Sequence, residues 1–203
     1  MLDALRQPLE AGETVIARAN HRISYPSRIQ LIAAMNPCRC GRAGEPGYAC
    51  RQGRGCVERY QARISGPLLD RIDLQIEVPA VSAADLVLPA ASEGSAEVRA
   101  RVTAARKIQA ERFAALKHPA RAPMPIATEA CSMTHRRSRS RRAHLAAREA
   151  ADALGLSARA ITGTLRVART LADLDGEARV ARIHIAEALS YRGETLRRAQ
   201  AAA

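Results

Sequence analysis

The sequence has almost no large aromatic side chains: tryptophan is absent, and phenylalanine occurs once in 203 residues. Its hydrophobic share is still 47%, much of it alanine, so a core can form and a helix-rich one is favoured. Long apolar runs are also missing, since even Ile29–Met35 contains Gln30. A membrane span needs roughly 20 apolar residues, and an export signal needs a charged start before an apolar segment. We therefore expect a cytoplasmic protein without membrane contact.

Acidic residues are too few to balance the basic ones, 20 against 32, which leaves a net charge of +12. Five of the arginines lie within Arg136–Arg142, in the run RRSRSRR, and the remainder of the chain carries +7. Such an excess favours a polyanionic partner such as DNA, because neutralised phosphates release counterions. Two alternatives stay open: a general use of arginine on the surface, and a local frameshift that produced the run.

The order of the expected elements is strands first and helices last. Apolar spacing predicts a helix over Leu2–Leu9 ended at Gly12, strands at Glu13–Arg18, Ile29–Met35 and Leu74–Val78, and a turn at Tyr25-Pro26. It predicts helices at Glu97–Leu116, Ala143–Leu154, Ala158–Leu174 and Arg182–Tyr191. This order indicates an α/β domain followed by a helical lid. The expected boundaries are 1–95, with a Cys-rich insert at 37–57, then a helix and linker over 96–126, and the lid over 127–203.

Four of the five cysteines fall within nineteen residues, at Cys38, Cys40, Cys50 and Cys56, whereas Cys131 stands apart. Without an export signal, disulfides are less favoured than a metal site. Zinc takes four tetrahedral thiolates, and the glycines of this stretch let the backbone fold tightly around one ion. The spacing therefore predicts a zinc site. The alternative is four free thiols on a loop.

Three polar positions stand where nucleotide chemistry could use them. Asn36 directly follows an apolar segment expected to be a strand, although Asn also favours a turn before Pro37. Arg71 lies between two carboxylates, so it is either a cation offered to a phosphate or part of a surface salt bridge with Asp70 or Asp73. Arg159 follows the expected helix cap Ser157 in the first turn, where a nearby anion would stabilise it.

The sequences of these segments closely resemble those of the magnesium-chelatase-like AAA+ ATPases, in their competence-associated ComM (YifB-type) branch. The resemblance covers 1–116 and 149–192 and rests on LDALRQPLE, AAMNPC, RISGPLLDRIDL, the triplet SAR, LRVARTLADLDG and IAEALSYR. It implies the C-terminal part of an AAA+ P-loop module, with the remaining strands of a parallel sheet, followed by an all-α lid bundle.

The resemblance also implies roles for single residues. Asn36 would be sensor 1, which positions the attacking water, and Arg71 would be an arginine finger acting on a neighbouring subunit. Arg159 would be sensor 2, which reaches the ATP phosphates from the lid. The family implies ATP and Mg²⁺ as cofactors, a homo-oligomeric ring, most often a hexamer, and DNA branch migration during natural transformation.

Two departures from the family are visible. No G-x-x-x-x-G-K-[ST] motif occurs, and the phosphate-binding loop and the Mg²⁺ carboxylates would lie upstream of Met1 in a full-length relative. We therefore expect a fragment that cannot hydrolyse ATP by itself. In the insert, many relatives carry C-x-C in the second half, whereas here Gln52 takes the place of that second cysteine and Cys56 would replace it.

The sequence leaves two other functions open beside the ring ATPase. The chain could be a non-enzymatic zinc-containing module that binds nucleic acid, but such a module has no need of Asn36 and the LLDR arginine. It could also belong to an ATPase that inserts magnesium into a tetrapyrrole, a branch that does not share the cysteine cluster. The resemblance therefore favours the ATP-driven DNA motor.

Overall fold

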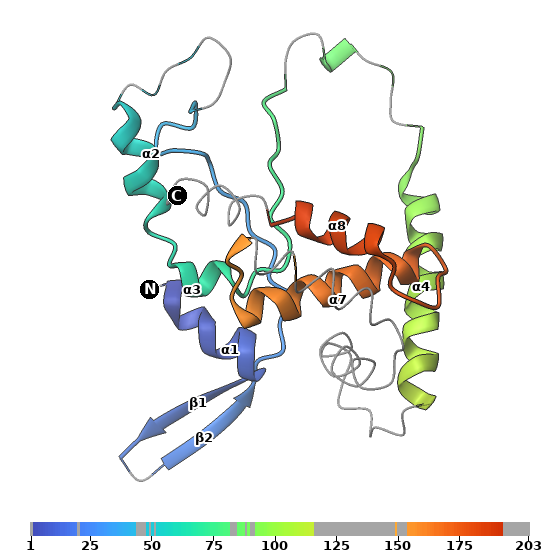
Figure 1. Cartoon of the computed structure of the whole chain (residues 1–203). Helices are drawn as coiled ribbons and strands as arrows, with labels where there is room; N and C mark the ends of the chain where they lie inside the picture. The colour runs from blue at the N-terminus through green and yellow to red at the C-terminus, as the bar shows by residue number, and fades with distance from the viewer. Residues whose placement is uncertain are drawn as a thin grey trace. The chain divides into compact units, whose positions relative to one another are not determined.

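The structure is a computed structural model that describes residues 2–19, 21–43, 48, 50, 52–81, 85–87, 89, 92–115, 149 and 154–192. The chain divides into two compact units, shown in Figure 1. The first comprises Met1–Ile72 and Glu77–Leu88, and the second comprises Asp73–Ile76 and Pro89–Ala203. Each unit is described by itself below.

The first unit begins with the short 3-10 helix η1 (Leu2–Leu5) and α1 (Arg6–Ala11). Gly12 ends α1 in the left-handed conformation, at φ 67°, and its N–H donates to Pro8 O at 2.9 Å. Glycine adopts this conformation without the steric penalty that a Cβ brings. The predicted short helix and its Gly12 turn are therefore confirmed.

An antiparallel hairpin follows, made of β1 (Glu13–Arg18) and β2 (His21–Pro26) (Figure 1). The strand at Glu13–Arg18 was predicted, but the turn at Tyr25-Pro26 is wrong. Tyr25 pairs with Thr14 and Pro26 with Glu13, so both residues lie in the second strand. Pro26 is tolerated because it is the last residue of that strand.

The predicted strands at Ile29–Met35 and Leu74–Val78 do not form. Both segments lack regular structure, apart from one isolated parallel bridge between Gln75 and Arg192. Their apolar side chains are exposed, with Ile32 and Val78 each at 84%. A strand is held by hydrogen bonds to neighbouring strands, and within the described ranges the hairpin is the only sheet. The fold is thus mixed α/β, as predicted, but its described sheet is antiparallel rather than parallel.

The first unit also contains three short helices. They are α2 (Arg54–Gln61), α3 (Gly66–Leu69) and the 3-10 helix η2 (Asp85–Val87). Pro67 stands in the first turn of α3, where its missing N–H removes no helical hydrogen bond. The hydroxyl of Ser65, just before α3, donates to Asp3 of η1 and so ties α3 to the start of the chain.

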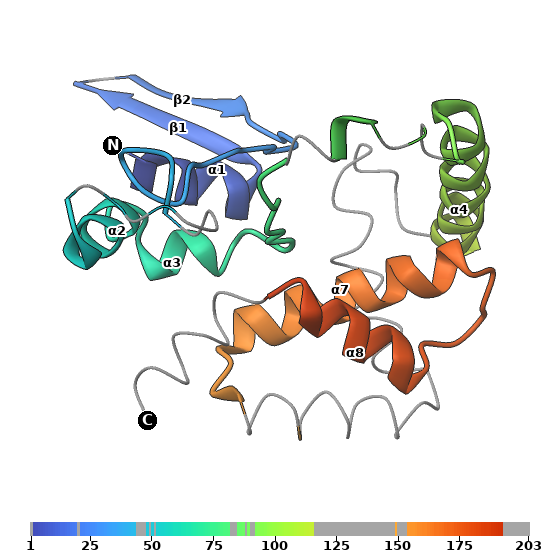
Figure 2. The same ribbon diagram turned by 90° about the horizontal axis from the view of Figure 1, so that it is seen from above.

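The second unit is built from α4 (Ser95–Ala115), α7 (Ala158–Leu174) and α8 (Arg182–Ser190). Figure 2 shows α8 lying along α7. Ala168 of α7 and Ile185 and Ala188 of α8 form the buried core between them. Small alanines let the helix backbones approach closely, which explains how a chain poor in aromatics packs. The predictions of helices at these three places are confirmed.

A buried carboxylate joins α4 to α7. Asp173 on α7 is 2% exposed and accepts hydrogen bonds from Arg112 on α4 and from Arg169 one turn earlier on α7. Gln109 of α4 lies 3.4 Å from the same carboxylate. Because charged groups are rarely buried unless they are paired, this cluster determines how the two helices meet.

Three predictions concern residues outside the described ranges: Cys131, the arginine run Arg136–Arg142 and most of the helix Ala143–Leu154. Among the helices that the structure describes, none is long and apolar enough to cross a membrane.

Candidate functional site

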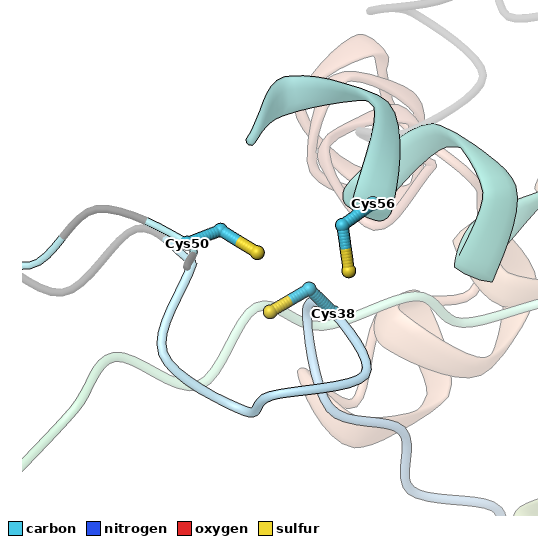
Figure 3. Close-up of side chains that lie close together, drawn as sticks. All are labelled: Cys38, Cys50 and Cys56. Carbon is cyan, nitrogen blue, oxygen red and sulfur yellow. The ribbon is translucent and has the colours of Figure 1, made fainter. Parts of the chain in front are cut away.

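The four clustered cysteines come together in the first unit. The Sγ atoms of Cys38, Cys50 and Cys56 all lie within 4.8 Å of one another (Figure 3). Cys40 Sγ lies 3.0 Å from Cys38 Sγ and 3.2 Å from Cys50 Sγ. Cys38 is fully buried, whereas Cys40 is exposed. One thiol therefore faces solvent and the cluster as a whole is compact.

Hydrogen bonding shifts the pKa values of two of these thiols in opposite directions. The contact with Cys40, aided by backbone hydrogen bonds at residues 40, 42 and 43, lowers the pKa of Cys38 to about 6. The contact with Cys40 also raises the pKa of Cys50 to about 12. The thiolate is the form that binds metal ions and reacts as a nucleophile, and the lowered pKa favours that form at Cys38.

Asn36 lies at the entrance to the cysteine loop. It is exposed and has no regular secondary structure, because the segment before it is not a strand. A Cβ built on Gly41 would lie 3.9 Å from Asn36 Nδ2, so the amide lies beside the turn that carries Cys38 and Cys40. The predicted position at the end of a buried strand is therefore not seen. Its predicted role as sensor 1 stays a prediction.

Arg71 is held within the first unit after α3. Its side chain is 9% exposed, pairs with Glu10 of α1 and donates to the carbonyl of Pro67. This Glu10 partner was not anticipated. An open depression of about 290 Å³ adjoins the pair, lined by Arg6, Gln7, Glu10, Ala11 and Arg71.

Arg159 is exposed in the first turn of α7, as predicted. Ser157 caps that helix, because its hydroxyl accepts a hydrogen bond from the N–H of Ala160 at 3.1 Å. Asn36 and Arg71 belong to the first unit and Arg159 to the second. Of the predicted site residues, the structure thus brings together Cys38, Cys50 and Cys56, with Cys40 in contact with the first two.

Sequence reasoning missed a cluster around Asp73 in the second unit. Asp73 Oδ1 accepts hydrogen bonds from Arg166 of α7 at 2.9 Å and from Arg192 at 3.5 Å. The N–H of Gln75 donates to Tyr191 O at 2.7 Å. Gly163 of α7 faces the same place: a Cβ there would collide with the side chains of Asp73 and Arg192. The only signal in the sequence was the Gly163 inside an otherwise regular helix.

Comparisons with known proteins cover nearly the whole chain. The family model described as magnesium chelatase, subunit ChlI, matches residues 1–86, and its C-terminal counterpart matches residues 92–192. The chain is 42% identical to competence protein ComM of Haemophilus influenzae over 200 residues, and 39% identical to the protein YifB of Escherichia coli over 201 residues. These alignments take in 95% and 94% of this chain, which spans 36% of the length of each relative. The chain therefore belongs to the magnesium-chelatase-like family.

Proposed function

We propose that this chain is the lid and arginine-finger part of an AAA+ motor that hydrolyses ATP to remodel DNA. The observation that carries the proposal is the family match over 1–86 and 92–192. Asn36, Arg71 and Arg159 lie within these ranges, in the order that the resemblance implies for sensor 1, finger and sensor 2. The motor would work as a ring, most often a hexamer, with ATP and Mg²⁺ bound between subunits. Its DNA role would be branch migration during natural transformation.

The surroundings of Arg71 suit a finger that changes partners. Glu10 is about half exposed, so its ion pair with Arg71 lies at the edge of solvent. Because the Arg71 side chain is itself only 9% exposed, the pair lies between an exposed one, which contributes at most about 1 kcal/mol, and a buried one, whose disruption is unfavourable by about 3–5 kcal/mol. A γ-phosphate of a neighbouring subunit would have to take the place of Glu10 as the anion beside Arg71. Arginine is suited to this exchange, because its planar guanidinium binds carboxylates and phosphates in the same geometry.

The position of Arg159 supports a phosphate partner on the lid. A cation in the first turn of a helix opposes the helix dipole, which is unfavourable by about 0.3–1 kcal/mol in exposed positions. A bound phosphate reverses the sign of that interaction. Following the resemblance, we assign Arg159 to the ATP phosphates and Asn36 to the orientation of the attacking water.

The two alternative functions receive less support. A simple nucleic-acid-binding module would not explain a family match that extends over both units. The names of the family models agree with the second alternative, magnesium insertion into a tetrapyrrole. However, the named relative reported above is a competence protein. The cysteine cluster also distinguishes the chain from that branch, as the resemblance implies.

The test is a chimera in which this chain replaces the matched region of the Haemophilus ComM protein. The chimera should hydrolyse ATP, and Arg71→Ala should reduce the turnover by roughly three to five orders of magnitude, because a finger acts on the transition state. Ring assembly and nucleotide affinity should stay near those of the unchanged chimera.

Glu10→Gln is the matched control, since it breaks the same ion pair and leaves the arginine in place. It should leave ATP turnover within a few-fold of the unchanged chimera. Equal losses in both variants would show that the ion pair is structural and that Arg71 is no finger. No turnover in the chimera, while the parent ComM is active, would contradict the proposed function as a whole.

A further inference from the structure

The cysteine loop consists of two turns with the same local sequence. Residues 38–41 read Cys-Arg-Cys-Gly, and residues 50–53 read Cys-Arg-Gln-Gly. In each turn the glycine N–H donates to the carbonyl of the cysteine three residues earlier, at 3.0 Å for Cys38 and 2.9 Å for Cys50.

Both glycines have positive φ, 82° for Gly41 and 73° for Gly53, which other residues rarely adopt. Cys38 and Cys50 therefore each begin a turn with the same backbone hydrogen bond and a glycine of positive φ at its end.

The third cysteine of the cluster, Cys56, comes from a helix. Cys56 stands in the first turn of α2 and its N–H donates to Gly53 O at 3.1 Å, so the second turn leads directly into this helix. In the first turn the second sulfur comes from Cys40, whereas the equivalent position of the second turn is Gln52. Cys56 thus supplies the sulfur that Gln52 cannot.

We propose that Cys38, Cys40, Cys50 and Cys56 bind one Zn²⁺ that closes the two turns onto α2. Zinc with four sulfurs at about 2.3 Å holds them roughly 3.8 Å apart in a tetrahedron. The sulfurs of Cys38, Cys50 and Cys56 already lie within 4.8 Å of one another, and Cys40 Sγ lies 3.0 Å from Cys38 Sγ and 3.2 Å from Cys50 Sγ. Cys40 does not meet the 4.8 Å limit together with Cys56, so binding of one ion by all four requires Cys40 to move toward the other three. Figure 3 shows the side chains of Cys38, Cys50 and Cys56 lying close together, Cys56 from α2 and the other two from the loop.

A single ion fits this geometry better than an iron–sulfur cluster. Tetrahedral sites with four sulfurs hold either zinc or iron–sulfur centres. In a cluster the ligating sulfurs are bound to different iron atoms, so they lie farther apart than around one ion. The site is also expected to be structural, because four protein ligands leave no open position for a substrate. It is independent of ATP binding.

The test uses the full chain, produced with zinc in the medium and desalted without chelator. Metal analysis should give one zinc per chain and no iron. The four clustered thiols should resist alkylation until a strong chelator removes the zinc. Zinc near zero, iron in its place, or disulfides among the four cysteines in freshly purified protein would each overturn the proposal.

Single variants identify the ligands. Cys38→Ser and Cys56→Ser should lower the zinc content to near zero, and the control Cys131→Ser should keep one zinc per chain. A chain with Cys56→Ser that keeps its zinc through desalting would remove Cys56 from the site. Cys40→Ser and Cys50→Ser should lower the zinc content in the same way, since each would remove one of the four thiolates.

A rescue experiment guards against loss of zinc through misfolding. The double variant Gln52→Cys with Cys56→Ser places the fourth thiol where the first turn has Cys40. It should recover the one zinc per chain that Cys56→Ser alone loses. Failure to recover it, in protein whose helical circular dichroism matches that of the parent, would contradict the equivalence of the two turns on which the proposal rests.

Discussion

Asp73 Oδ1 accepts a hydrogen bond of 2.9 Å from Arg166 Nη2 of α7, across 93 residues of sequence. Asp73 follows the proposed finger Arg71 by two residues, and α7 is the helix that begins beside Arg159. The segment Asp73–Ile76 therefore belongs structurally with the helices of the second unit, although it follows the first unit in sequence.

Replacing Asp73 with alanine should destabilise the second unit. The buried Arg192 and the half-buried Arg166 would lose a carboxylate, which places the loss between that of an exposed pair and that of a buried charge, about 1–2 kcal/mol. Urea unfolding followed by helical circular dichroism measures it. Glu93→Gln, which breaks the exposed pair with Arg101, should change stability by less than about 1 kcal/mol. Equal effects in the two variants would contradict the assignment.

Gly163→Ala should lower stability, although alanine normally stabilises a helix by about 1 kcal/mol relative to glycine. The added methyl group would collide with Asp73 and Arg192 and force their ion pair apart. Overpacking of this kind is unfavourable by about 1–3 kcal/mol. The exposed neighbour Thr162→Ala is the control and should be neutral or slightly stabilising in the same unfolding measurement. A gain in Gly163→Ala would show that the close approach does not exist in solution.

Asp173→Ala should be the most damaging single change in the second unit. It leaves the guanidinium groups of Arg112 on α4 and Arg169 on α7 without their common carboxylate. Removing one partner of a buried ion pair is unfavourable by about 3–5 kcal/mol. Thermal unfolding should shift by many degrees, and proteolysis should become faster. A loss below about 1 kcal/mol would mean that the α4–α7 contact contributes little to the folded state.

Ser157→Ala should weaken the start of α7 by about 1 kcal/mol, since the hydroxyl accepts the N–H of Ala160. Ser157→Asp should preserve or improve stability, because a carboxylate both caps the helix and faces the positive end of its dipole. Chemical denaturation of the two variants beside the parent measures both effects. The reverse order of stability would argue against the cap.

The chain alone should not turn over ATP, because none of its 203 residues forms a phosphate-binding loop of the G-x-x-x-x-G-K-[ST] type. A coupled assay with and without DNA should stay at the level of buffer. Sustained hydrolysis on the order of 1 per second that is lost in an Arg71→Ala variant would contradict this prediction. It would show that the chain binds ATP without a phosphate-binding loop of this type.

Local features of the second unit could be read from the sequence. The bounds of α7 were predicted as observed, because its apolar spacing and the Ser157 cap depend on residues within one or two turns.

The cysteine cluster of the first unit could also be predicted from local sequence, because its four thiols are close along the chain and glycines permit the turns between them. What could not be predicted there was that Cys56 comes from the first turn of α2.

Only the tertiary structure decided the partners of residues far apart along the chain. An apolar segment such as Ile29–Met35 becomes a strand only beside another strand, and its own residues carry no information about that neighbour. Arg71 pairs with Glu10 rather than with the nearby Asp73, and Asp73 pairs with Arg166. Charges attract at any sequence separation, so composition and periodicity determine which helices form, whereas the choice among many possible ion pairs depends on how those helices pack.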